Sequence, residues 1–69
     1  MEFTHYRRHT NGRIAEVADY SKGRRHGATV WFYNNGFLER VAEFWYDQLH
    51  GDYYEFWPNG KRAVRAQYI

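Results

Sequence analysis

Cysteine is absent from this 69-residue chain, and proline occurs once. Without cysteine, the chain can form neither a disulfide nor a thiolate metal site, and it has no cysteine nucleophile. No apolar run is long enough to cross a membrane as a helix. The N-terminal residues also lack the hydrophobic region of a secretory signal peptide. We therefore expect a cytoplasmic protein without a membrane span.

Signals of catalysis and of metal binding are equally sparse. There is no glycine-rich phosphate loop and no known serine–histidine–acid spacing. An extended strand would hold His5 and His9 about 13 Å apart, too far to share one ion. His26 and His50 each precede a glycine, and we expect them to serve the hydrogen bonding of their own loops. The sequence predicts a protein that is not an enzyme and that has neither a metal nor a cofactor.

Aromatic residues, in contrast, make up 22% of the chain. They favour strands and bury a large area per residue. The net charge of +2 is too small to indicate nucleic-acid binding by itself. A chain of this length buries only about 60% of the surface that its unfolded form exposes. We expect one small domain, for which a partner or a second copy would add stability.

A repeat of 24 residues is the main pattern in the sequence. Asn-Gly begins at positions 11, 35 and 59, and His-Gly begins at positions 26 and 50. Shifting residues 11–45 onto 35–69 aligns these pairs without a gap. The same shift superimposes three alanines and the aromatic residue two places after each: Ala18, Ala42, Ala66, Tyr20, Phe44 and Tyr68. The sequence therefore contains a duplicated structural unit.

Each unit has the pattern of a β-hairpin. Asn-Gly between alternating apolar runs predicts a tight primed turn with positive φ, and residues 21–27 and 46–51 predict a longer second turn. Strands are expected at about 3–9, 13–20, 28–33, 37–45, 52–57 and 61–68. The predicted fold is all-β: an antiparallel meander of about six strands in one open, twisted sheet. Residues 1–69 form a single domain, with partial repeats at 1–10 and 59–69 and full repeats at 11–34 and 35–58.

This pattern resembles the MORN-type repeat proteins, and most closely the bacterial YwqK-like variant. The similar residues run from Tyr33-Asn34-Asn35-Gly36 to Phe44, and from His50-Gly51 to Phe56-Trp57. The similarity covers about residues 10–69. It implies a meandering sheet that curls into a groove, and it implies protein–protein contact, scaffolding or an antitoxin role.

Strand alternation assigns the remaining aromatic residues to a second face. The repeated alanines and the aromatic residues two places later share one face, which is the predicted core. A single-layer sheet cannot bury both faces, and exposed aromatic surface usually marks an interaction site. We therefore predict a module that binds or sequesters a partner protein, as an inhibitor or antitoxin does. The predicted interface residues are Trp31, Tyr33, Phe37, Trp45, Tyr53, Trp57, Arg24 and Arg25.

Two alternatives stay open at this point. Basic residues interleaved with aromatic ones could hold phosphates and bases of a nucleic acid, although charges of this kind also protect the edges of a sheet. They form clusters at Arg7-Arg8-His9, Arg24-Arg25-His26 and Lys61-Arg62, with Arg65 nearby. The other alternative is a structural homodimer that folds only when two copies associate. Salt-dependent binding would indicate the first alternative, and a melting temperature that rises with protein concentration would indicate the second.

Overall fold

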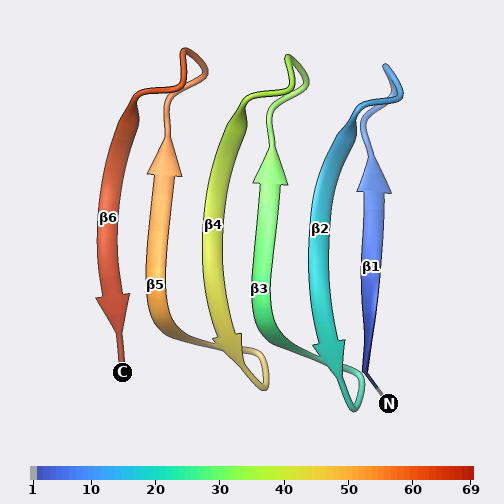
Figure 1. The fold of residues 1–69 in the computed structure, drawn as a ribbon, viewed down its shortest axis with the longest axis vertical. Coiled ribbons are helices and arrows are strands. Elements are labelled where there is room, and N and C mark those ends of the chain that lie inside the picture. Colours follow the sequence, from blue (N-terminus) through green and yellow to red (C-terminus); the bar gives the residue numbers. More distant parts are fainter. Residues whose placement is uncertain (1) are drawn as a thin grey trace.

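A computed structural model describes residues 2–69, so the first residue of the expected partial repeat 1–10 lies outside the described residues. The described chain forms one antiparallel sheet in which every strand pairs with its neighbours in sequence (Figure 1). The prediction of an all-β meander with one open sheet is confirmed. The strands are β1 (Glu2–Arg8), β2 (Ile14–Ser21), β3 (Arg24–Phe32), β4 (Leu38–Trp45), β5 (Gln48–Phe56) and β6 (Arg62–Tyr68).

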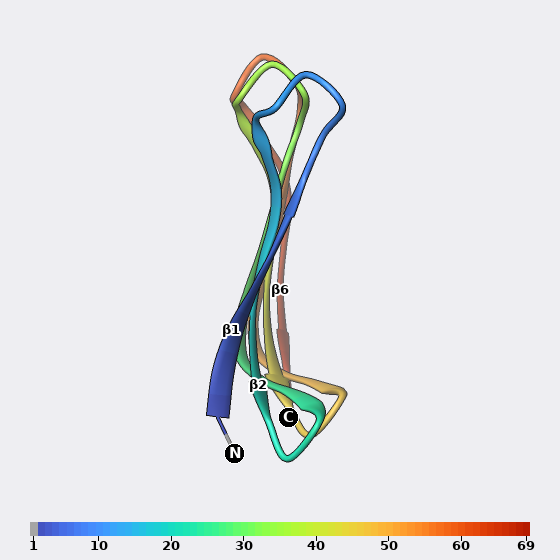
Figure 2. The ribbon, with the colours of Figure 1, turned by 90° about the vertical axis from the view of Figure 1, so that its right-hand side faces the viewer.

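The sheet is a single layer, with overall extents of 33 × 27 × 10 Å. Seen from its side, the described chain shows no second layer over either face (Figure 2). The apolar core among residues 2–69 is correspondingly small, because its only buried hydrophobic residues are Ala15, Ala18 and Ala42. Side chains that lie on the sheet surface therefore provide most of the packing.

The Asn-Gly turns are three-residue loops. In the first of them, Gly12 N donates to His9 O at 2.9 Å and His9 N donates to Arg13 O at 2.8 Å. Asn11 Oδ1 accepts a hydrogen bond from Arg13 N at 3.0 Å, and Gly12 has a φ of 88°. Only the glycine takes the left-handed conformation, which is the pattern of a type I turn followed by a glycine bulge. The prediction of primed turns at Asn-Gly is therefore wrong.

The primed turns occur instead at the other end of the hairpins. Lys22 and Gly23 have φ values of 53° and 77°, and Tyr46 and Asp47 have values of 45° and 72°. Two consecutive residues with positive φ are typical of the two-residue turn whose twist matches that of the flanking strands. The longer loops predicted at 21–27 and 46–51 are wrong, because β3 and β5 begin directly after these turns.

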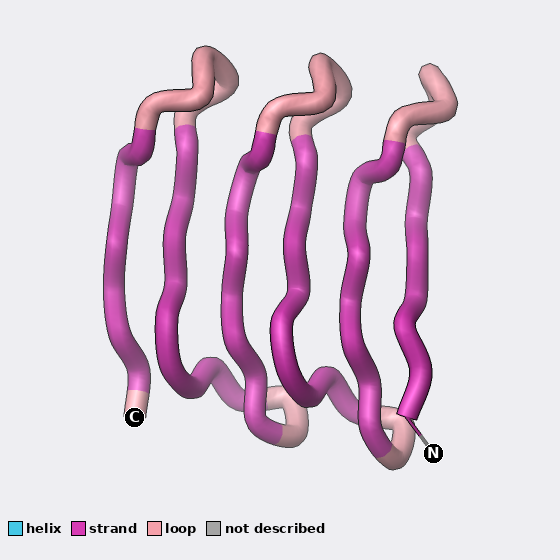
Figure 3. Tube along the Cα trace, in the orientation of Figure 1, coloured by secondary structure: helices cyan, strands magenta, loops and turns pink. Residues whose placement is uncertain are grey.

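The His-Gly pairs lie inside strands and mark bends. Gly27 and Gly51 have φ values of 104° and 99°, and the strand register shifts opposite them, between Ala18 and Tyr20 and between Ala42 and Phe44. Figure 3 shows β3 and β5 bending near their N-terminal ends while they stay in the sheet. A β-bulge with glycine in the left-handed region bends a strand in this way.

Side chains connect each Asn-Gly turn to the next one. Asn11 Nδ2 donates to Asn34 O at 2.7 Å, and Asn35 Nδ2 donates to Pro58 O at 3.1 Å. The residue directly before each of these two loops also reaches a backbone oxygen of the next hairpin through its ring. His9 Nε2 lies 2.7 Å from Phe32 O, and the Tyr33 hydroxyl donates to Phe56 O at 2.6 Å. We call these contacts the turn ladder. It holds successive hairpins in register at one end of the sheet.

Cross-strand pairing defines the two faces. Ala18 pairs with Thr29, Thr29 with Ala42, and Ala42 with Tyr53, so these residues share one face, which we call the alanine face. Trp31 lies on it as well, because it follows Thr29 by two residues and pairs with Arg40. The prediction that Trp31 and Tyr53 lie opposite the repeated alanines is therefore wrong. Turn lengths and bulges, which the alternation pattern does not contain, set the register.

Candidate functional site

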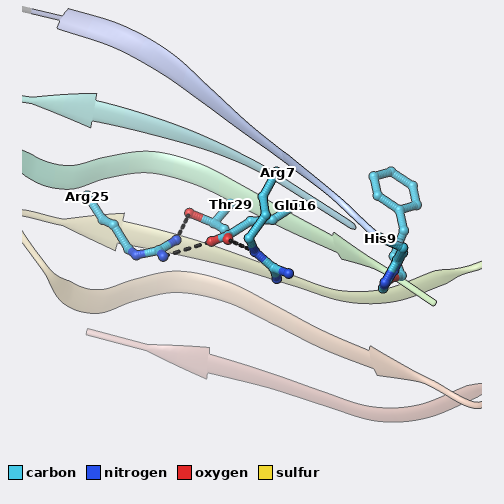
Figure 4. A network of polar contacts seen from close by, with 6 residues as sticks. Arg7, His9, Glu16, Arg25 and Thr29 are labelled. Carbon is cyan, nitrogen blue, oxygen red and sulfur yellow. Dashed lines mark hydrogen bonds and ion pairs between the residues drawn. The ribbon is translucent and has the colours of Figure 1, made fainter. Parts of the chain in front are cut away.

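A buried carboxylate organises the polar side chains of the alanine face. Glu16 is only 6% exposed, and it lies between Arg7 of β1 and Arg25 of β3 (Figure 4). Arg7 Nε donates to Glu16 Oε1 at 3.1 Å, and Arg25 Nη2 lies 2.7 Å from Glu16 Oε2. Arg25 Nη1 also donates to Thr29 Oγ1 at 3.2 Å. Arg7 and Arg25 belong to the basic clusters that could hold the phosphates of a nucleic acid. Both are therefore already paired with a carboxylate.

The titration of Glu16 reflects these contacts. Burial raises the pKa of this carboxyl, because a low-dielectric environment disfavours its charged form. The hydrogen bonds and charges of Arg25 and Arg7 act in the opposite direction and prevail, so that the pKa of Glu16 lies below its ordinary value of 4.5. The network is thus held together by an ionised carboxylate at neutral pH.

Arginines also stack on the aromatic rings of this face. The Arg40 guanidinium carbon lies 4.2 Å from the centre of the Trp31 ring, and the Arg25 carbon lies 5.5–5.8 Å from the centres of Tyr20, Trp31 and Phe44. Such cation–π contacts cover ring faces while each guanidinium keeps its planar set of donors. Arg40 Nε is buried and has no hydrogen-bond partner among the described residues.

A groove of about 520 Å³ runs over β3 to β6 on the alanine face. Its floor is Ala42, which has 0% exposure, because small side chains in the central row leave space between the larger side chains on either side. We call it the aromatic groove. Its walls are Trp31, Arg40, Phe44, Leu49, Tyr53, Glu55, Val64 and Tyr68.

Tyr53 occupies the middle of the aromatic groove. Its hydroxyl donates to Glu55 Oε1 at 2.9 Å, and its ring meets Tyr68 edge-on with centroids 6.1 Å apart. Burial and the hydrogen bond to the Glu55 carboxylate raise the pKa of Tyr53, so the phenol stays neutral and its proton is directed to Glu55. A neutral phenol, an indole ring and aliphatic carbons make this surface suitable for an apolar side chain with a nearby hydrogen-bonding group.

The predicted interface residues lie in three parts of the sheet, of which two adjoin. Tyr33 and Trp57 line a second hollow that shares Arg40, Glu55 and Val64 with the aromatic groove. Trp31 and Tyr53 line the groove, and Arg25 stacks beside it. Tyr33, Phe37 and Trp57 lie instead at the end of the sheet that carries the Asn-Gly turns, where Trp57 is 58% exposed. The remaining two lie near the primed turns: Trp45 packs against His26, with centroids 4.4 Å apart, and Arg24 is exposed at the start of β3.

Several groove residues were absent from the predicted interface. Phe44 and Tyr68 were assigned to a covered core because they belong to the repeated pattern, yet their face has no covering layer in the described chain. Arg40 and Leu49 had no distinguishing pattern of their own. The only signal that could have placed them was their cross-strand register with Trp31, Phe44 and Glu55, which requires the turn geometry.

Among residues 2–69, the side chains that commonly ligate metals are histidine, aspartate and glutamate, because the chain has no cysteine. In that range, histidine and acidic side chains do not form any group of three that could hold a metal ion. No helix of the described chain has the length and apolar character needed to span a membrane.

Comparison with known proteins gives no relative for this arrangement. No protein-family model matches the chain, and no curated protein and no solved structure matches it either.

Proposed function

We propose that this chain is a non-catalytic, MORN-type repeat module that binds a partner protein through the aromatic groove. The observation that carries the proposal is the groove itself, an aromatic surface on a single-layer sheet that no other described segment covers. Exposed contiguous aromatic surface usually marks a protein interaction site. An apolar anchor of the partner would pack between Trp31, Phe44 and Tyr53.

The charged groups of the face favour a protein over a nucleic acid. Arg7 and Arg25 already contact Glu16, and Arg40 lies over the Trp31 ring and beside Tyr53. These guanidinium groups therefore have less capacity for phosphate than free surface arginines. They serve better as hydrogen-bond donors at the rim of a protein interface, where arginine and aromatic residues are common.

A pair of single variants tests this function. Tyr53→Ser removes the ring in the middle of the groove, whereas Phe37→Ser removes an exposed ring at the Asn-Gly turn end, 47% exposed and outside the groove. Proteins retained by the wild-type chain from a lysate of the source cell would be identified, purified and titrated against all three forms. We expect Tyr53→Ser to weaken binding of the purified partner by about tenfold or more, the size of an interface hot spot.

Phe37→Ser is the matched control and should bind as the wild-type chain does. Equal binding by both variants, or greater weakening by Phe37→Ser, would contradict a partner site in the groove. Affinity should also change little with salt, because burial of aromatic surface releases few counterions. A steep loss between low and moderate salt would indicate phosphate binding instead.

A further inference from the structure

The turn ladder ends at the last hairpin with its donors unused. At equivalent positions one repeat apart, His9 and Tyr33 reach a backbone oxygen of the following hairpin, and Asn11 and Asn35 do the same. The next residues in these series are Trp57 and Asn59. Asn59 Oδ1 accepts from Lys61 N as in the other turns, but the Trp57 indole N–H and the Asn59 amide have no hairpin to meet among residues 2–69.

The strand beside these donors is also unpaired on one side in the described chain. β6 pairs with β5 alone, and all but one of its residues are exposed. Its outer backbone N–H and C=O groups can therefore pair with an incoming strand. The Trp57 and Asn59 positions fix where that strand would lie, because upstream they bind carbonyl oxygens two residues apart on the next strand and turn.

The charges of β6 differ from those of the strands that it repeats. β6 has no acidic residue and carries Arg62 and Arg65, and Lys61 precedes it. The equivalent strands have a net negative charge instead, since β2 contains Glu16 and Asp19, and β4 contains Glu39 and Glu43 against one arginine, Arg40. β6, which has one unpaired edge in the described chain, is thus basic, whereas β2 and β4 are not.

The basic character of β6 indicates which kind of strand could pair with its unpaired edge. A second copy would present one of its own unpaired edges: β6, which is basic, or β1, which carries Arg7 and Arg8 against a single glutamate, Glu2. Like charges directly opposite each other destabilise a strand pair, and opposite charges stabilise it. An acidic segment therefore fits this edge better than a second copy of the chain does.

We propose that the β6 edge binds an extended acidic segment of a partner protein by strand addition. The segment runs antiparallel to β6, and its carboxylates lie opposite Arg62 and Arg65. Its backbone oxygens accept hydrogen bonds from the Trp57 indole and the Asn59 amide. Main-chain pairing supplies affinity in this type of recognition, and the side chains supply selectivity. This site borders the aromatic groove, whose walls include Val64 and Tyr68 of β6, but it does not depend on the function proposed for that groove.

The probe for this site is a blocked peptide of about eight residues that alternates valine and glutamate, a usual strand length. A peptide that alternates valine and lysine is its counterpart. Both would be titrated into the isotope-labelled 69-residue chain, with amide hydrogen exchange followed by NMR. We expect the acidic peptide to protect the β6 amides that do not bond to β5, and the basic peptide to leave them unprotected.

Charge reversal at the edge gives the decisive comparison. Arg62→Glu with Arg65→Glu should weaken binding of the acidic peptide by about tenfold or more, because two attractive cross-strand pairs become repulsive. The matched control, Lys22→Glu with Arg24→Glu, makes the same charge change at exposed residues of the β2–β3 hairpin, far from β6, and should bind the acidic peptide as tightly as the wild-type chain. Asn59→Ala, which leaves every charge in place, should also weaken binding.

Three results would overturn the proposal. The first is equal protection by both peptides. The second is protection of the β6 amides without peptide that grows with protein concentration, because a second copy would then occupy the edge. The third is binding that survives reversal of Arg62 and Arg65 but is lost in Tyr53→Ser, because the peptide would then occupy the groove. That third result would leave the proposed function of the groove intact.

Discussion

At the scale of single residues, Glu16 explains how a thin sheet holds a buried charge. Isolated burial of a carboxylate is costly, and the cost is offset only when charged partners and hydrogen bonds surround it. Arg7 and Arg25 come from the two strands on either side of β2, so the ionised group joins three strands. The network also fixes Arg25 above the rings of Tyr20 and Phe44 beside the aromatic groove.

The pKa of Glu16 leads to a pH-dependent stability. Because this pKa is lower in the folded chain than its ordinary value of 4.5, the contribution of Glu16 is present above pH 4.5 and is lost as the pH falls through the folded pKa. Glu16→Gln should lower the free energy of unfolding by about 2 kcal/mol at pH 7, since hydrogen bonds to charged groups contribute about 1.5–3 kcal/mol.

Urea unfolding of both proteins between pH 3 and pH 7 measures this effect. The difference in the free energy of unfolding between wild type and Glu16→Gln should decrease as the pH falls below 4.5. If this difference in free energy of unfolding stays constant over the range, the ionised form of Glu16 does not stabilise the fold.

The sequence predicted the positions of individual side chains less well than it predicted the strands. Trp31, Tyr53 and Arg25 were expected at an interface, and the structure places them in or beside the groove. The face that these residues share with Ala18 and Ala42 was not foreseen, because one bulge or one extra turn residue moves a side chain to the other side of a sheet. The sequence could not identify the partners of Glu16 for the same reason, since they lie on separate strands.

At the scale of structural elements, the two kinds of turn have different roles. The primed turns close hairpins locally, whereas the Asn-Gly turns also connect one hairpin to the next through the turn ladder. Asparagine suits both tasks, because its carbonyl oxygen caps its own loop while its amide reaches the neighbouring loop. The spacing of Asn-Gly predicted where the hairpins turn, but it did not predict these contacts between repeats.

Asn35 and Asn59 form a natural pair for measuring the turn ladder. Both accept a hydrogen bond within their own loop, from Phe37 N and from Lys61 N, but only Asn35 donates to the next turn. Asn35→Ala should therefore destabilise the chain more than Asn59→Ala, by about 0.5–1.5 kcal/mol, the usual net contribution of one hydrogen bond. Urea unfolding of the two variants gives the difference directly, and equal losses would mean that the cross-repeat bond adds no stability.

Element boundaries show where the prediction from sequence held and where it failed. The six strands were predicted because Asn-Gly and alternating residues mark hairpins clearly. β3 and β5 were predicted to begin too late, because His26-Gly27 and His50-Gly51 were interpreted as loop ends. The structure has a bulge at each glycine and a turn several residues earlier, and Tyr46-Asp47 carries no common turn signal.

At the scale of the whole molecule, the charges at both edges of the sheet oppose self-association. β1 carries Arg7 and Arg8, and β6 carries Arg62 and Arg65. Basic residues on exposed edge strands are one means by which β-proteins avoid pairing with copies of themselves. A homodimer would have to bring these edges together or cover one of the two faces of the sheet.

We therefore expect the isolated chain to be a monomer of 8.4 kDa. Light scattering across a wide range of protein concentrations, at low and at moderate salt, measures the molar mass. Salt screens repulsion between exposed charges, so any association through the edges should increase with salt. A constant mass of two chains at every concentration would instead support the homodimer alternative.

The turn ladder also makes the width of the sheet adjustable. Every repeat meets the next through the same contacts, so a further copy of residues 35–58 inserted in register would add two strands without new local geometry. Each such step would widen the sheet by about 10 Å, the spacing of two strand intervals. Reach across a partner would then change by whole repeats, and gene duplication alone could match the length of this protein to the length of its target.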